Sequence, residues 1–207
     1  MKTGALILAA GGAARFGGPK QLLEIDGETL VDRACKTALA AGCEPVLRVL
    51  GARAEEILKR PELPDVSTVV HENWQDGMGS SLAGGICRLL EIEPECDAVF
   101  ILLADQPLVS PGLLETMLPL LEEHFSMVIC EYGESSGPPA LFKWPHFPEL
   151  MELTGDRGAK ALASKHPGAV AWFPFPGGAC DIDSQVAWEK FQTDHAESLN
   201  KSNDPND

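Results

Sequence analysis

The stretch that indicates the fold lies near the N-terminus and reads Leu8-Ala-Ala-Gly-Gly-Ala-Ala-Arg-Phe-Gly-Gly-Pro-Lys20. It continues an apolar run, Ala5-Leu-Ile-Leu8, that predicts a buried strand. Glycines let the backbone after such a strand bend sharply and come close to a ligand. The exposed N–H groups can face an anion, and Arg15 and Lys20 can neutralise its charge. A strand followed by this loop favours a site for a phosphorylated nucleotide over the alternative, a glycine-rich turn without a ligand.

The loop differs from the two common phosphate-binding motifs. Gly12 and Gly17 have the spacing of a P-loop, but Gly18-Pro19 follows where that motif requires Lys and then Ser or Thr. The dinucleotide fingerprint G-x-G-x-x-G is absent, because Gly11 and Gly12 are adjacent and no glycine occupies the later positions. A dehydrogenase is therefore a poor interpretation of this chain.

Length and composition indicate one globular domain. With 207 residues and 44% hydrophobic residues, the chain can bury a substantial core. We predict a single domain over 1–195 and a disordered polar tail over 196–207. No apolar run approaches the roughly 20 residues that span a bilayer, and the N-terminus lacks a signal peptide, so we expect a cytoplasmic protein without a membrane partner. The six cysteines form no C-x-x-C pair, which favours buried, reduced thiols over zinc or disulfides.

The acidic balance restricts the partners. A formal net charge of −15 argues against binding to nucleic acid. It also makes an anionic substrate costly to bind unless a divalent cation accompanies it. The charge therefore favours a metal–nucleotide complex, in which the cation's own charge has to be counted.

Strands and helices alternate along the first half of the chain. The predicted strands are 5–9, 45–50, 66–70 and 98–103, and the predicted helices are 29–41, 54–59, 80–90 and 111–123. This βα alternation predicts a mostly parallel sheet with helices on both faces. Ligands of such sheets bind at the carboxyl ends of the strands, where the glycine loop and Asp105 both fall.

The second half is less regular. It predicts strands at 127–130, 169–173 and 179–182, and helices at 147–153, 158–165 and 185–192. The segment 133–139 is rich in Gly, Ser and Pro and is predicted as a loop, which could close over a second substrate or simply connect two elements on the surface.

Three aspartates follow apolar runs. Asp105 comes after Val99-Phe-Ile-Leu-Leu-Ala104, where a carboxylate can hold Mg²⁺ or merely cap a turn. Alternation would place Asp181 and Asp183 on one face of a strand, although one of them could serve only as a helix cap. Two separate acidic strand ends suit one Mg²⁺ that bridges the phosphates of a nucleotide.

Two further segments could contact a ligand. The turn-rich stretch from His71 to Ser81 offers backbone N–H groups and hydroxyls to a base, ribose or phosphate, while Ser80 or Ser81 could also just cap the next helix. Arg157 at a helix start could bind a phosphate, but a pairing with Asp156 is favoured. The five histidines are scattered without metal-ligand spacing, and we assign them no role.

In combination, these motifs resemble a known family. The first one is similar to the L-A-A-G-x-x-x-R-[MF]-G-x-x-K signature of the molybdenum cofactor nucleotidyltransferase (MobA-like) family. Further motifs follow the order of its cytidylyltransferase branch, and the resemblance covers roughly residues 5 to 190. They are Asn73-Trp-Gln-Asp-Gly-Met-Gly-Ser-Ser-Leu82, Asp105-Gln-Pro107, Gly137-Pro-Pro139, Leu153-Thr-Gly-Asp-Arg-Gly158 and Asp181-Ile-Asp183. The chain departs from the pattern at Ser184-Gln185, where Thr-Pro is usual.

The resemblance implies a fold and a reaction. The fold would be a three-layer α/β/α, Rossmann-like nucleotidyltransferase of the nucleotide-diphospho-sugar transferase type. The reaction would be the Mg²⁺-dependent transfer of a nucleoside monophosphate from an NTP with release of pyrophosphate. In the cytidylyltransferase branch the donor is CTP and the acceptor is the terminal phosphate of molybdopterin, and a molybdoenzyme or chaperone could receive the product. The preference for cytosine follows from the resemblance alone.

The resemblance also implies roles for residues. Arg15 and Lys20 would hold the triphosphate and act with Asp105 in catalysis, and Asp105 and Asp183 would hold Mg²⁺. The acceptor would face Arg157 and the segment Gly137–Pro139. The predicted nucleotide- and substrate-binding residues are Leu8, Ala9, Ala10, Gly11, Gly12, Lys20, Asn73, Gly79, Ser80, Ser81, Gly137, Pro138 and Arg157. Two alternatives are a related transferase acting on a sugar phosphate or another phosphorylated acceptor, and a nucleotide-binding protein that delivers a cofactor without turnover.

Overall fold

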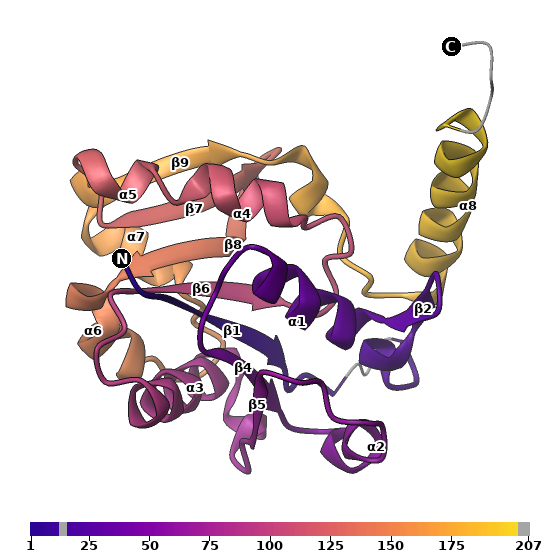
Figure 1. Cartoon of the computed structure of the whole chain (residues 1–207), viewed down its shortest axis with the longest axis horizontal. Helices are drawn as coiled ribbons and strands as arrows, with labels where there is room; N and C mark the ends of the chain where they lie inside the picture. The colour runs from indigo at the N-terminus through magenta and orange to yellow at the C-terminus, as the bar shows by residue number, and fades with distance from the viewer. Residues whose placement is uncertain (13–15, 203–207) are drawn as a thin grey trace.

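The main sheet of the molecule has seven strands in the order β5-β4-β1-β6-β8-β7-β9 (Figure 1). The computed structural model describes residues 1–12 and 16–202. β8 runs antiparallel to both of its neighbours, and the other neighbouring strands are parallel. The strands are β1 Thr3–Ala9, β4 Val46–Leu50, β5 Val66–Val70, β6 Ala98–Leu103, β7 Met127–Tyr132, β8 Ser135–Lys143 and β9 Val170–Pro174. The prediction of a mostly parallel sheet is confirmed.

Helices cover both faces of this sheet. They are α1 Leu30–Ala40, α2 Ala54–Leu58, α3 Met78–Ile92, α4 Pro111–Met117, α5 Leu120–Glu123, α6 Phe147–Met151, α7 Lys160–Lys165 and α8 Gln185–Ser202. Alternate residues of β1 enter two apolar clusters, because successive side chains of a strand point to opposite faces. Ala5 and Ile7 pack with α1 and α4, whereas Leu6 and Leu8 pack with α3, α6 and α7. The result is the expected three-layer α/β/α arrangement.

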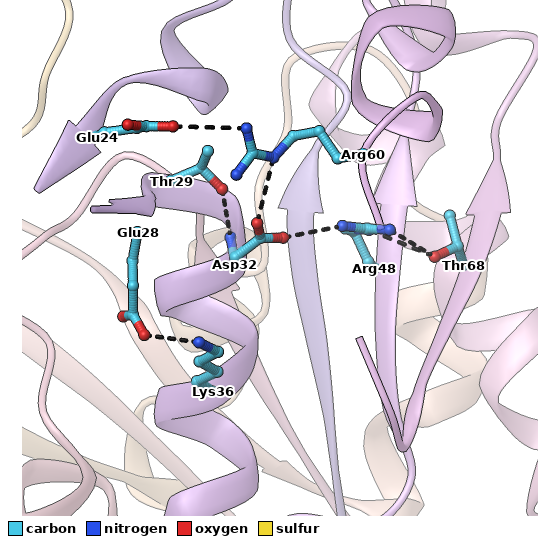
Figure 2. A network of polar contacts seen from close by, with 8 residues as sticks. All are labelled: Glu24, Glu28, Thr29, Asp32, Lys36, Arg48, Arg60 and Thr68. Atoms are coloured by element: carbon cyan, nitrogen blue, oxygen red, sulfur yellow. Dashed lines mark hydrogen bonds and ion pairs between the residues drawn. The ribbon is translucent and has the colours of Figure 1, made fainter. Parts of the chain in front are cut away.

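A buried polar network ties α1 to the sheet (Figure 2). Arg48 of β4, only 4% exposed, donates to Asp32 Oδ1 at 3.3 Å and to Thr68 Oγ1 of β5 at 3.1 Å. Arg60 approaches the other carboxylate oxygen of Asp32 at 3.5 Å. The Asp32 backbone N–H also donates to Thr29 Oγ1, which caps α1. Because the buried charges are paired and hydrogen-bonded, the network has a structural role.

Three of the sequence-based predictions are wrong, all of them after residue 110. The predicted helix 111–123 is split into α4 and α5 around Pro119, which has no N–H to donate to the preceding turn. The predicted loop 133–139 belongs largely to β8, whose Pro138 and Pro139 fall in a register shift between Ile129 and Cys130 of β7, where the ladder needs no N–H.

The third error is the predicted strand 179–182. A 3-10 helix, Pro176–Ala179, precedes an irregular segment in which the Ile182 N–H donates to the Asp105 carbonyl oxygen at 3.1 Å. Ile182 is fully buried, but in a cluster with Ile25, Leu30, Trp188 and Phe191 rather than within a sheet. The apolar pattern around Ile182 therefore reflects packing against α8 and not strand pairing.

The C-terminal helix is longer than predicted. α8 continues to Ser202, so residues 196–202 of the predicted disordered tail are helical, and 203–207 lie outside the described residues. No Gly or Pro interrupts the chain from Gln185 to Ser202, which removes the usual reason for a helix to end. In Figure 1 α8 projects from the body beside β2. Among the described residues, no helix combines the length and the apolar character that crossing a bilayer requires.

A short hairpin was missed. β2 (Glu24–Ile25) and β3 (Glu28–Thr29) pair through Asp26 and Gly27, which have φ angles of 53° and 81°. Asp-Gly between two extended residues is typical of a tight hairpin turn, so the sequence did carry a signal for it.

Candidate functional site

A cavity of about 400 Å³ opens at the carboxyl ends of β1 and β6. Its wall comes from the glycine loop, the segment before α3 and the end of β6. The lining residues are Leu8, Ala9, Ala10, Gly11, Gly12, Lys20, Gln21, Trp74, Gln75, Gly77, Met78, Ser81, Leu103, Ala104, Asp105 and Asp156. This is the edge of an open α/β sheet at which ligands bind.

Lys20 lies between two carboxylates at this cavity. Its Nζ is 2.5 Å from Asp105 Oδ2 and 2.6 Å from Asp183 Oδ1. Burial alone would lower the pKa of Lys20, but the charges and hydrogen bonds of Asp105 and Asp183 outweigh that effect and raise it. Residues 85 and 163 positions from Lys20 thus converge on one cationic centre.

Asp181 adds a third carboxylate near the pair. Its Oδ1 is buried and has no hydrogen-bond partner among the residues that the structure describes. Burial, reinforced by the charge of Asp105, raises the pKa of Asp181 to about 6. The hydrogen bond from the Ile182 N–H to the Asp105 carbonyl oxygen holds this segment against the end of β6, although the segment is not the predicted strand.

The donor set fits a hard divalent cation. Asp105 and Asp183 already direct one oxygen each at a single positive centre, the Lys20 ammonium. Carboxylate oxygens are the ligands that Mg²⁺ and Mn²⁺ prefer. The buried carboxylate of Asp181, whose pKa responds to the charges of Asp105, Asp183 and Lys20, offers further negative potential at the same place.

The backbone of the glycine loop is held by a side chain that the sequence analysis missed. Gln21, 2% exposed, donates from Nε2 to the Gly11 carbonyl oxygen at 2.8 Å and to the Ala9 carbonyl oxygen at 3.2 Å. No motif pointed to Gln21 other than its place directly after Lys20. Gly12 faces the ring of Trp74, with 3.5 Å between the position of an added Cβ and the nearest ring atom. Arg15, predicted to hold the triphosphate, lies outside the described residues.

The segment before α3 and the first turn of that helix reach the cavity only in part by the predicted residues. Ser81 lines the cavity, as do the unpredicted Trp74 and Met78. Ser80 instead contacts His71, with Oγ 2.7 Å from Nε2, and donates to the carbonyl oxygen of Asn73. Neither Asn73 nor Ser80 is part of the cavity lining.

Gly77 and Gly79 allow α3 to contact a neighbouring loop. The Gly79 N–H donates to the Gly155 carbonyl oxygen at 2.8 Å, and Gly79 is buried away from the cavity lining. A Cβ on Gly77, whose φ is +99°, would lie 2.4 Å from the backbone carbonyl carbon of Gly155, and one on Gly79 would lie 2.7 Å from the Arg157 carbonyl oxygen. Backbone contact therefore accounts for both glycines, and Asp156 of the same loop reaches the cavity.

The predicted acceptor-facing residues also lie outside the cavity lining. Gly137 is buried against Tyr132, where an added Cβ would be 2.7 Å from the hydroxyl oxygen. The Pro138 carbonyl oxygen accepts from Gln106 Nε2 at 3.0 Å. Gln106 also donates to Gly178, so it ties β8 to the segment that leads to Asp181. Arg157 is exposed and directly follows Gly155 and Asp156 in the chain.

Comparison with known proteins agrees with this architecture. The chain matches the MobA-like NTP transferase domain over residues 5–170. It is 35% identical over 175 residues to nicotine blue oxidoreductase of Paenarthrobacter nicotinovorans, covering 78% of this chain and 81% of that protein. It is 31% identical over 194 residues to the purine catabolism protein PucB of Bacillus subtilis (strain 168), covering 89% of this chain and 93% of that protein.

Solved structures share the fold. Rv0371c from Mycobacterium tuberculosis H37Rv superposes with a TM-score of 0.79 at 26% identity over 91% of this chain and 96% of that one. A complex of Rv0371c with manganese superposes with a TM-score of 0.75 at 25% identity, covering 92% of this chain and 97% of that one. A nucleotidyl transferase from Methanothermobacter thermautotroptrophicus, at 21% identity and a TM-score of 0.80 over 95% of this chain and 99% of that one, shows the same fold. The chain therefore belongs to the MobA-like NTP transferase domain family, which confirms the resemblance of its sequence motifs.

Proposed function

We propose that the protein transfers a nucleoside monophosphate from an NTP to a phosphorylated acceptor and releases pyrophosphate. The observation that carries this proposal is the position of Lys20 between Asp105 and Asp183 beside the glycine loop. An oxygen of the acceptor phosphate forms a bond to the α-phosphorus of the NTP. The bond between that phosphorus and the bridging oxygen breaks, and its electrons leave with pyrophosphate.

The roles of the charged residues follow from their placement. Asp105 and Asp183 would hold a divalent ion, Mg²⁺ in our proposal, whose charge offsets that of the phosphates. With a divalent ion held by these carboxylates, the Lys20 ammonium would be available to bind the triphosphate. Arg15 would add a second cation from the same loop. Preorganised positive groups of this kind stabilise the charge that develops in the transition state.

A dedicated base is unnecessary for this reaction. The acceptor phosphate is already an anionic nucleophile, so catalysis consists of positioning and charge neutralisation. The net charge of −15 would repel two phosphorylated substrates in the absence of the cations gathered at the cavity. Gln21 supports positioning because its two donated bonds hold the loop that contacts the donor.

The identities of donor and acceptor belong to the same proposal. The motif order of the cytidylyltransferase branch supports CTP as donor and the terminal phosphate of molybdopterin as acceptor. A cytoplasmic molybdoenzyme or its chaperone would then take the product. A sugar phosphate as acceptor is the alternative within the same reaction class.

Pyrophosphate release is the direct test. Purified protein is mixed with each of CTP, GTP, ATP and UTP, with molybdopterin or a sugar phosphate, and with Mg²⁺, Mn²⁺ or EDTA. We expect pyrophosphate only with a divalent ion and fastest with CTP and molybdopterin. Release with a sugar phosphate alone would move the acceptor to the alternative, and equal rates with all four nucleotides would remove the cytosine preference.

A second arm tests the reaction class itself, since one relative is named an oxidoreductase. Oxidation of a reduced nicotinamide cofactor without any pyrophosphate release would contradict the proposal. The variant Lys20→Met should lower the rate of pyrophosphate release by about 10²–10³-fold, the usual cost of losing one preorganised electrostatic group. Lys36→Met is the matched control, because Lys36 pairs with Glu28 on the surface and should leave the rate unchanged.

A further inference from the structure

Three side chains with metal-ligand chemistry meet outside the cavity. They are His146, which ends the 3-10 helix Trp144–His146, Glu149 of α6, and His166, which follows α7. One ligand atom from each lies within 4.8 Å of the other two. Among the side chains that the structure describes, those of 1–12, 16–121 and 124–197, no other group of three His, Cys, Asp or Glu residues satisfies this geometry.

The contacts orient these ligand atoms. His166 Nε2 is 2.6 Å from Glu149 Oε1, and His146 Nδ1 is 4.0 Å from the same oxygen. A tetrahedral ion about 2.0–2.1 Å from its ligands spaces them roughly 3.3 Å apart, so these two separations need to change by less than about 1 Å each. Glu149 and His166 are both partly exposed, which leaves their side chains room to adjust.

A second layer of contacts holds His146 in place. Its Nε2 is 2.7 Å from Ser126 Oγ, and the residue is 7% exposed. When Nε2 carries the proton and donates to Ser126, Nδ1 keeps a free lone pair directed toward Glu149. Ser126 is itself anchored, since its N–H donates to the Ala169 carbonyl oxygen and its own carbonyl oxygen accepts from the Lys143 N–H. Metal-binding histidines commonly donate their second N–H to such an oxygen.

The group lies at the opposite edge of the sheet from the cavity. β7 starts at Met127 and β9 at Val170, while the antiparallel β8 ends at Lys143. Ser126, His146 and His166 therefore surround the amino-end edge of the parallel strands, whereas Asp105 follows the carboxyl end of β6. The nucleotidyl transfer proposed above uses none of these residues.

We propose that His146, Glu149 and His166 form a binding site for Zn²⁺, with water as the fourth ligand. Two imidazole nitrogens and one carboxylate oxygen are a donor set that zinc favours and that Mg²⁺ does not. Lys165 competes with the ion, because its ammonium is 3.2 Å from Glu149 Oε2. The alternative is a network of hydrogen bonds that stabilises α6 and α7 without an ion.

Calorimetric titration of the full-length protein with Zn²⁺ distinguishes a zinc site from an ion-free hydrogen-bond network. Because Cys87 is exposed and would add thiol binding, the titration uses a Cys87→Ser background. We expect one Zn²⁺ to bind per chain. Any heat released by Mg²⁺ should be the same in the parent and in Glu149→Gln. Glu149→Gln should weaken zinc binding about 10–100-fold, and His166→Ala should weaken it at least as much.

Lys165→Met provides the sharpest test. It removes a cation that repels Zn²⁺, so binding should tighten several-fold, whereas the ion-free network would only lose a contact. His195→Ala is the matched control, because His195 Nε2 lies 3.0 Å from Asp26 Oδ2 in a histidine–carboxylate pair elsewhere. The zinc affinity of this variant should equal that of the parent. Circular dichroism establishes that each variant is folded. If His166→Ala does not fold, Glu149→Gln carries the test, because its amide oxygen can still accept a hydrogen bond from His166.

Three results would overturn the proposal. They are no zinc binding by the parent, equal zinc affinity in Glu149→Gln and the parent, and zinc affinity that Lys165→Met leaves unchanged. Bound Zn²⁺ should also raise the melting temperature by mass action, and this rise should vanish in Glu149→Gln. Activity is not the readout, so failure here leaves the proposed transferase function untouched.

Discussion

The two edges of the central sheet carry different chemistry. The carboxyl-end edge gathers carboxylates and an ammonium around the cavity, with Lys20 between Asp105 and Asp183. The amino-end edge gathers two imidazoles and one carboxylate, His146, Glu149 and His166. Carboxylate oxygens suit Mg²⁺ and the ammonium suits phosphates, whereas the mixed nitrogen and oxygen set suits zinc. The sheet supplies the positions, and the residue types at each edge decide which cation each position can hold.

The two edges also differ in the sequence separation between the residues that meet there. Lys20 meets residues 85 and 163 positions away, so the cavity exists only after the sheet has formed. His146, Glu149 and His166 lie within one local segment, and only Ser126 is added from outside it. Substitutions at one edge should therefore have little effect on the other, and the following predictions test that separation.

The largest expected effect is the loss of transfer activity in Asp105→Asn. The substitution keeps the size of the side chain but removes the charge that faces Lys20 and would hold the divalent ion. We expect pyrophosphate release to fall by about 10²–10³-fold while zinc binding is unchanged. Glu149→Gln should show the reverse, with normal release and weakened zinc binding. A loss of both properties in either variant would show that the edges are coupled, and full activity in Asp105→Asn would contradict the role proposed for Asp105. Nucleotide binding without pyrophosphate release in the parent would favour a binding protein without turnover.

A smaller effect is expected from Gly77→Ala, which disturbs only the carboxyl-end edge. The added Cβ would lie 2.4 Å from the Gly155 backbone, at a residue whose φ is +99°. We expect the free energy of unfolding in urea to fall by at least about 2 kcal/mol. Gly112→Ala is the control, because nothing lies within 4 Å of its added Cβ and the residue is in α4, so stability should stay the same or rise. Equal stability of Gly77→Ala and the parent would show that the loop moves aside at little cost.

The smallest effect concerns Asp181 and depends on pH. Its pKa is raised to about 6 in the folded protein, so the folded state binds its proton more tightly than the unfolded state, whose carboxyl has an ordinary pKa near 3.9. The parent should therefore lose stability as pH rises from about 4 to 6, by about 1–2 kcal/mol once partial exposure is taken into account. Asp181→Asn has no such charge and should lack this loss.

Urea unfolding in EDTA at pH 4 and pH 7.5 measures this difference. We expect Asp181→Asn to be more stable than the parent at pH 7.5, and the advantage to shrink toward pH 4. Glu91→Gln is the control, because Glu91 is an exposed partner of Arg88 and should show no such trend. An advantage that is equal at both pH values would contradict a raised pKa for Asp181.

Much of the fold was predictable from sequence because its signals are local. The alternation of apolar runs with amphipathic stretches predicted β1, β4, β5 and β6 and the helices between them within a few residues. The wrong predictions fall where a local signal had two meanings. The Gly-Ser-Pro composition of 133–139 indicated a loop, but β8 accommodates both prolines at a register shift. The apolar residues around Ile182 indicated a strand, but Ile182 packs beneath α8.

The candidate site was predicted unevenly. The glycine loop, Lys20 and Asp105 do line one cavity, and Asp183 contacts Lys20 as a metal-site partner of Asp105 would. Gln21, Trp74 and Met78 were missed, since a buried Gln or an apolar side chain before a helix has no distinctive pattern. The histidines were assigned no role because their spacing in sequence gives no sign that His146 and His166 approach each other.

The sequence by itself determined the class of fold and indicated the candidate phosphate-binding residues, because periodicity and composition are properties of neighbouring residues. Tertiary structure alone decided which charges meet. The parallel strands β1 and β6 bring the segments that follow them, which carry Lys20 and Asp105, to one edge. Asp183 joins them because the neighbouring Ile182 N–H donates to the Asp105 carbonyl oxygen, and Ser126 reaches His146 because β7 and β8 are neighbours. Distances between residues far apart in the chain depend on strand order, which no local pattern specifies.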